Sequence, residues 1–189
     1  MKRWLRFTAA VLAAAFLFAL TGCGSSTNSA SFTLFVDSIP ANLDPQVASG
    51  ASDVIACENL YGTLVRKDPD GELVPGLCEK WTVSSDGLTY TFTLKDGLTY
   101  AAAKGAATEY DITAEDFVFA FRRIFRADTA SPYAVEFSAI QNSAAVQAGL
   151  ADESSLGVSA NGALTLVFRL SERDDNFLAK LALPGAAPC

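Results

Sequence analysis

Alternating apolar and polar positions over residues 81–95 predict an antiparallel β-hairpin. Apolar side chains occupy every other position of the segment LTYTFTLK, and threonines fill the positions between them. A period of two is typical of a strand with one buried face. Turn signals containing Pro, Asp or Gly lie at residues 68–71 and 84–87. We therefore expect residues 67–98 to form the β-rich region around which the rest of the chain folds.

Helical periodicity is clearest over residues 113–127, TAEDFVFAFRRIFRA. Thr113 is a suitable N-cap, and Glu115 and Asp116 fall in the first turn, where the helix dipole favours acids. The remaining predicted elements are weaker: strands at 31–36 and 63–65, helices from Asp53 towards Gly62 and over 133–148, a hairpin over 156–170 around Asn161-Gly162, and a last helix at 176–183, capped by Asp174 or Asp175 and stopped by Pro184.

The first 23 residues have the layout of an export signal. Three basic residues precede an apolar run at residues 7–20, which is short for a membrane-spanning helix. The following Leu20-Thr21-Gly22-Cys23 resembles the lipobox of bacterial lipoproteins. We expect a signal peptide at 1–22, a diacylglyceryl group on Cys23 and a flexible polar tether at 23–31. The alternatives are an ordinary signal peptide or an uncleaved anchor, with Cys23 incidental.

Charge and composition exclude several classes of function. The 189 residues carry 14 basic and 21 acidic side chains, a net charge of −7, which argues against a nucleic-acid partner. The chain contains no His, so it lacks His-based triads and His-ligated metals. No phosphate-binding glycine loop or metal-ligand spacing is present, and we expect no cofactor and no metal. Cys57 and Cys78 form either a disulfide or a pair of buried free thiols.

Charged clusters in the sequence offer no catalytic arrangement. The neighbouring acids Glu115-Asp116 and Asp174-Asp175 point in different directions on a helix and have a capping explanation. Arg122, Arg123 and Arg126 form either an anion site or, as we favour, a solvated face that complements the helix dipole. We find no nucleophile paired with a base and expect that the protein is not an enzyme.

Several motifs occur in the order and spacing of one known family. The chain resembles the extracytoplasmic solute-binding lipoproteins of ABC importers, family 5, the oligopeptide- and dipeptide-binding type. The resemblance spans most of residues 32–189 and is carried by Leu43-Asp44-Pro45, Asn59-Leu60-Tyr61, Leu73-Val74-Pro75-Gly76-Leu77, Glu79-Lys80-Trp81, Asp86-Gly87-Leu88-Thr89-Tyr90-Thr91-Phe92, Thr113-Ala114-Glu115-Asp116-Phe117-Val118 and Thr129-Ala130-Ser131-Pro132-Tyr133.

The resemblance implies a mixed α/β fold like that of type II periplasmic binding proteins. Residues 32–66 would begin the first ligand-binding lobe, and residues 67–189 would form an incomplete β-rich subdomain. Proteins of this family are more than twice as long, so we expect an N-terminal fragment that binds ligand poorly alone. The segment 100–111 is longer than its counterpart in the family, and Tyr61-Gly62-Thr63-Leu64 replaces the family's Tyr-Glu-Gly-Leu.

The resemblance also implies a function and a set of contacts. The protein would capture extended peptides outside the cytoplasmic membrane, held there by the lipid on Cys23, and deliver them to ABC permease subunits. Ser49, Gly50, Ala51 and Tyr133 match ligand-facing elements; the alternatives are a connecting loop and a core aromatic. The competing functions are binding of nickel chelates, haem or oligosaccharides on the same scaffold, a surface interaction lipoprotein and an extracytoplasmic hydrolase.

Overall fold

The computed structural model describes residues 33, 35–101 and 110–188, and residues 36–189 form one compact unit. The predicted signal peptide, Cys23 and the tether 23–31 lie outside the described residues. Thr33, Phe35 and Val36, which fall in the strand predicted at 31–36, belong to no strand. Among the described residues, no helix combines the length and the apolar character needed to cross a bilayer.

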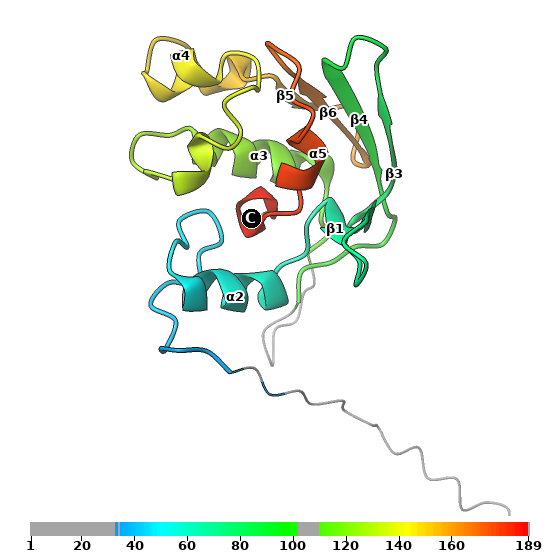
Figure 1. Cartoon of the computed structure of the whole chain (residues 1–189). Helices are drawn as coiled ribbons and strands as arrows, with labels where there is room; N and C mark the ends of the chain where they lie inside the picture. The colour runs from blue at the N-terminus through cyan, green and yellow to red at the C-terminus, as the bar shows by residue number, and fades with distance from the viewer. Residues whose placement is uncertain (1–32, 34, 102–109, 189) are drawn as a thin grey trace, which may run out of the picture. The chain divides into compact units, whose positions relative to one another are not determined.

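A four-stranded antiparallel sheet forms one side of the compact unit (Figure 1). Its strand order is β3-β4-β6-β5, built from β3 (Cys78–Val83), β4 (Thr89–Leu94), β6 (Thr165–Arg169) and β5 (Val158–Ala160). The two hairpins predicted from sequence, β3–β4 and β5–β6, are confirmed. They are joined because β4 pairs with β6, with Phe92 opposite Leu166. A β-bulge between Cys78 and Lys80 interrupts the edge strand β3.

The first turn signal closes a smaller, two-stranded sheet. Strand β1 (Val65–Lys67) pairs with β2 (Leu73–Pro75) across the turn at residues 68–71. Gly71 has a φ of +87°, a conformation in which glycine carries no steric penalty. The Asp68 carboxylate accepts hydrogen bonds from the amides of Asp70 and Glu72. The predicted strand 63–65 thus lies two residues later, at 65–67.

Alternation along the strands decides which side chains reach the core. Tyr90, Phe92 and Leu94 of β4 are buried, whereas its threonines are half-buried. Across the sheet, Phe168 packs edge-to-face on Phe92, with ring centroids 5.9 Å apart. The alternation over residues 81–95 also predicts that Val83 is buried, and this is wrong. Val83 is 42% exposed because it lies in β3, at the edge of the sheet.

The clearest predicted helix covers the inner face of this sheet (Figure 1). Helix α3 (Ala114–Ile124) begins after Thr113, whose capping box with Asp116 is present as expected. Phe121 of α3 contacts Phe168 of β6 at 4.8 Å between ring centroids. Apolar burial between a helix and a sheet is the main stabilising term of such a layer. The helix also binds Gln46, through Ala120 and Arg123, on the way to the candidate site.

Helix α2 (Ala51–Leu60) begins two residues earlier than predicted. Gly50 is the N-cap in an extended conformation, and Asp53 lies inside the first turn. The carboxylate of Asp53 accepts a 2.7 Å hydrogen bond from the amide of Ala41, so it ties down the preceding loop rather than starting the helix.

The helix predicted over 133–148 is wrong for most of its length. The structure has a short 3-10 helix η1 (Pro132–Ala134), turns, and the five-residue helix α4 (Ser143–Gln147). The backbone at Ile140 pairs with Leu170 at the end of β6, and the amide of Gln141 donates to the carbonyl of Arg169. Asn142 has a φ of +63°, which a continuous helix does not allow.

The C-terminal segment is also less helical than predicted. Its elements are η2 (Glu153–Ser155), α5 (Phe177–Lys180) and η3 (Pro184–Ala186). The N-cap of α5 is Asn176 and not Asp174 or Asp175 as predicted; the Asp174 carboxylate instead accepts from the amide of Asn176, one residue before the helix. Phe177 packs on Phe168, and residues 184–188 are buried. Among these buried residues, Gly185 lies against the ring of Tyr133.

Candidate functional site

The segment predicted as a ligand-facing loop is exposed at the start of α2: Ser49 and Gly50 precede the helix, and Ala51 is its first residue. Ser49, Gly50 and Ala51 all lie on the surface. A Cβ added at Gly50 would meet only the Asp53 carboxylate, at 3.4 Å, so the loop leaves room for another backbone to approach. The structure therefore places these three residues where they can contact a partner molecule.

The buried side-chain amide of Gln46 holds the segment that leads into this loop. Gln46 is fully buried, and its Nε2 donates a 2.7 Å hydrogen bond to the carbonyl of Ala120 in α3. Its Oε1 accepts from Nη1 of Arg123 at 2.7 Å. Its backbone carbonyl accepts from the hydroxyl of Ser131 at 2.5 Å. Residues distant in sequence thus meet at Gln46.

Tyr133 lies directly behind the loop. Its hydroxyl donates to the carbonyl of Ala48 at 3.3 Å, across 85 positions of sequence. The ring is 8% exposed and lies so close to Gly185 that a Cβ there would be 2.4 Å from Cγ. Burial raises the pKa of the Tyr133 hydroxyl. The structure thus brings Tyr133 next to the segment that leads into residues 49–51. Tyr133 is itself packed as a core aromatic, which is the alternative expected for it from the sequence.

An ion pair holds the beginning of the same segment. Both terminal nitrogens of Arg123, Nη1 and Nη2, donate to the carboxylate of Asp44, Nη1 at 3.0 Å. The hydrogen bond from Arg123 holds the pKa of Asp44 below its ordinary value of 3.8. Asp44 also accepts from the amide of Gln46, at 3.0 Å. Arg123 is therefore an internal tie, which helical spacing alone did not reveal.

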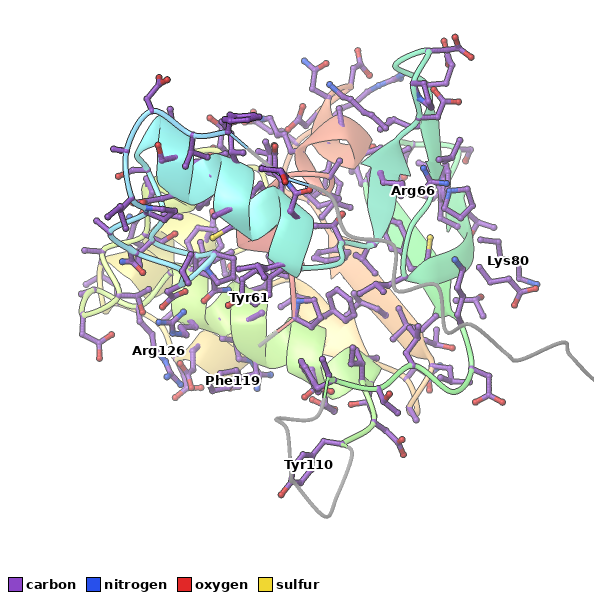
Figure 2. All side chains as sticks on the ribbon, turned by 90° about the horizontal axis from the view of Figure 1, so that it is seen from below. Tyr61, Arg66, Lys80, Tyr110, Phe119 and Arg126 are labelled. Carbon is purple, nitrogen blue, oxygen red and sulfur yellow. The ribbon has the colours of Figure 1, made fainter. Side chains whose placement is uncertain are left out.

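Arg126, another of the three arginines at the end of α3, also has an acidic partner. Arg126 makes two hydrogen bonds to Glu153, at 2.7 and 2.9 Å, and its guanidinium carbon lies 5.5 Å from the centroid of the Phe119 ring. Figure 2 shows Arg126 and Phe119 side by side. Because Arg123 and Arg126 both have acidic partners, the interpretation of the arginines as an anion site gains no support.

Two surface hollows lie near Tyr61, and no pattern in the sequence predicted either of them. One, of about 500 Å³, is lined by Leu43, Asp44, Pro45, Tyr61, Phe119 and Arg123. The second, of about 580 Å³, lies between the C-terminal end of α2, strand β1 and the chain around Leu183 and Pro184. Tyr61 borders both, and its hydroxyl donates to the carbonyl of Leu43 at 2.8 Å.

The cysteines predicted as a possible disulfide are free in the structure. Cys57 in α2 and Cys78 in β3 are both buried, and burial raises the pKa of each thiol. The structure therefore has the second of the two alternatives. Within the described residues, no group of His, Cys, Asp and Glu side chains is arranged to hold a metal ion.

Comparison with known proteins shows to which family the chain belongs. Residues 72–189 match the model for bacterial extracellular solute-binding proteins, family 5, middle region. This match covers more than half of the chain, and the chain belongs to family 5 of the extracellular solute-binding proteins. The family resemblance inferred from the motifs is confirmed.

Individual relatives are similar over most of this chain but only part of their own. The periplasmic murein peptide-binding protein MppA of Escherichia coli is 35% identical over 135 residues, 70% of this chain and 24% of MppA. The probable deoxycholate-binding periplasmic protein YgiS of the same organism is 35% identical over 151 residues, 79% of this chain and 27% of YgiS.

Solved structures confirm the fold class. Haemophilus influenzae OppA in complex with the peptide RPPGFSPFR superposes with a TM-score of 0.70 and 28% identity, over 79% of this chain and 28% of OppA. The chain spans about a quarter of the length of the relatives that it matches. The predicted mixed α/β fold of a type II periplasmic binding protein, covering part of the family's length, is confirmed.

Proposed function

We propose that this protein is the peptide-capturing component of an ABC importer. It holds extended peptides outside the cytoplasmic membrane and delivers them to the permease subunits. It binds and releases its ligand without chemical change. Ser49, Gly50 and Ala51 contact the peptide backbone, and Tyr133 supports them.

The observation that carries this proposal is the exposed loop 49–51 on a scaffold shared with a peptide-bound relative. The structure of Haemophilus influenzae OppA, which matches 79% of this chain, was solved with a nine-residue peptide. MppA is named for murein peptides, whereas YgiS is named for deoxycholate. An exposed loop with an unhindered glycine suits an extended backbone, which binds by main-chain hydrogen bonds.

Saturation-transfer NMR on the full-length protein in detergent tests peptide binding at the weak affinity expected of part of a cleft. The probes are a set of unlabelled tripeptides and, as controls, maltose, deoxycholate and a nickel–histidine chelate. The proposal predicts transfer to peptide protons that falls when Ala51 is replaced by Trp, which obstructs the loop. Transfer to deoxycholate or another control alone would overturn the proposal.

The anchor of the protein is part of the same proposal. Cleavage of the signal peptide 1–22 leaves Cys23 as the lipid-bearing residue, followed by the tether 23–31. Residues 32–66 begin the first ligand-binding lobe, and 67–189 belong to the β-rich subdomain beside it. Two or more acyl chains give stable attachment to a membrane, so the tether keeps the binding lobe near the permease.

Expression in a bacterial host with globomycin tests the anchor. The inhibitor should cause the unprocessed precursor to accumulate, and labelled palmitate should enter the wild-type protein but not the Cys23→Ala variant. Normal processing in globomycin, or label in the Cys23→Ala variant, would show that Cys23 is not the lipid attachment site.

A further inference from the structure

We propose that Gln46 is the positioning residue of the peptide-contacting loop, acting together with Ser131 and Tyr133. This inference rests on the proposed function of loop 49–51. It assigns a role to Gln46, a residue within none of the motifs that identify the family.

Gln46 is buried, and both ends of its side-chain amide have partners. The side chain is fully buried, and a buried amide without partners is costly, on the order of 1–3 kcal/mol. Both ends of this amide are satisfied, by Ala120 and by Arg123 of α3. These are bonds to a rigid helix whose own position is set by the aromatic core. The segment before the loop is therefore attached to a helix that packs against the aromatic core.

Several hydrogen bonds converge on one turn of backbone, residues 44–48. The Ser131 hydroxyl donates to the carbonyl of Gln46, and the Tyr133 hydroxyl donates to the carbonyl of Ala48. The amides of Val47 and Ala48 donate to the carbonyl of Asp44, at 3.2 and 3.0 Å. The chain is thus held from residue 44 up to residue 48, immediately before the exposed loop.

The attachment of residues 44–48 affects the conformational entropy that the loop loses on binding. A loop held in its binding conformation loses less conformational entropy when a ligand arrives. Because residues 49–51 themselves are exposed, their conformation depends on where residue 48 and the start of α2 are placed. The buried amide at position 46 therefore sets the affinity of a loop that it does not itself belong to.

The test combines hydrogen exchange with peptide binding on the full-length protein in detergent. The main variant is Gln46→Met, which keeps the size of the side chain and removes both hydrogen bonds. The amides of Val47 and Ala48 should exchange at least about tenfold faster, because two hydrogen bonds of ordinary strength are lost. The matched control Gln141→Met changes an exposed glutamine and should leave these amides unchanged.

A second variant keeps the test informative if Gln46→Met does not fold. Ser131→Ala removes one hydroxyl that donates to the Gln46 carbonyl, and should accelerate the same amides about fivefold. Its control is Ser143→Ala, since Ser143 is also buried and donates to a carbonyl, that of Ser138, at 2.6 Å. Ser143 lies outside the loop, so this control should not affect the exchange of Val47 or Ala48.

The outcomes separate this inference from the proposed function. Faster exchange together with at least a twofold loss of saturation transfer to the tripeptide supports the positioning role. Unchanged exchange at Val47 and Ala48 overturns it, whatever happens to the peptide. Faster exchange with unchanged peptide transfer also overturns it, because the loop would then not control binding. Absence of peptide transfer in the wild type is the failure of the proposed function alone.

Discussion

Gly185 offers the sharpest test of how Tyr133 is held behind the loop. The added Cβ of Gly185→Ala would lie 2.4, 2.5 and 2.8 Å from Cγ, Cδ2 and Cδ1 of the Tyr133 ring. Carbon atoms in favourable contact lie about 3.5–4.0 Å apart, so the ring must move by roughly 1 Å. Movement of the ring also weakens the bond from its hydroxyl to the carbonyl of Ala48.

The magnitude follows from these opposing terms. Overpacking of a core costs about 1–3 kcal/mol, and the hydroxyl bond contributes about 1 kcal/mol. Replacing glycine by alanine in a compatible backbone returns about 0.4–1 kcal/mol through the unfolded state. We therefore expect Gly185→Ala to lower the free energy of unfolding by about 1–3 kcal/mol. The reduced conformational entropy of the unfolded chain would, by itself, raise this free energy.

Urea denaturation followed by tryptophan fluorescence measures this change. With a slope of about 2 kcal/mol per molar, the midpoint should fall by about 0.5–1.5 M. Gly62→Ala is the matched control: its Cβ would meet only the side chain of Leu77, at 2.9 Å, which can rotate away. In a Tyr133→Ala background, the effect of Gly185→Ala should largely vanish, since the ring is absent.

Two results would refute this reasoning. One is a midpoint for Gly185→Ala that is equal to or above that of the wild type. The other is an undiminished loss of stability when Tyr133 is already alanine, which would place the strain elsewhere around Gly185. Either result would mean that the ring is not confined between Gly185 and the Ala48 carbonyl.

Three further predictions follow from other contacts. The lowered pKa of Asp44 means that its pairing with Arg123 stabilises the fold above the ordinary value of 3.8 and is lost as pH falls through the lower folded value; Asp44→Asn should therefore show a smaller loss of urea stability on acidification, and an unchanged pH dependence would contradict this. Cys57 and Cys78 should resist iodoacetamide at neutral pH and react in urea without reductant, as followed by mass spectrometry; a need for reductant would indicate a disulfide. Phe168→Ala should cost about 3–5 kcal/mol in urea denaturation, since three aromatic rings pack on it, and a cost below about 1 kcal/mol would argue against this core.

The local patterns predicted the parts of the fold that are stabilised locally. The turn at Gly87 and the alternation of Tyr90 and Phe92 predicted the β3–β4 hairpin, and the capping residue Thr113 predicted the start of α3. The segment 133–148 failed because its apolar residues serve a non-local purpose. The backbone of Ile140 extends the sheet, and no helical periodicity in sequence can report a partner thirty residues away.

The candidate site shows the same division. Sequence motifs pointed to Ser49–Ala51 and to Tyr133 as two separate elements, and the structure places Tyr133 beneath the carbonyl of Ala48. Gln46 escaped notice because a single glutamine in a loop has no periodic or motif signal. Its importance comes from contacts with Ala120 and Ser131, which lie 74 and 85 positions away in sequence.

The pairing of β4 with β6 determines the order in which this chain can fold. Strand β4 lies inside the sheet, yet its second neighbour begins only at Thr165, some seventy residues after β4 ends. Closing so long a loop makes sheet completion a slow, non-local step. Until then, one edge of β4 and its row of Tyr90, Phe92 and Leu94 are uncovered. A nascent or exported chain thus exposes this strand while the seventy residues between β4 and β6 emerge, so a chaperone that shields the strand should raise the folded yield.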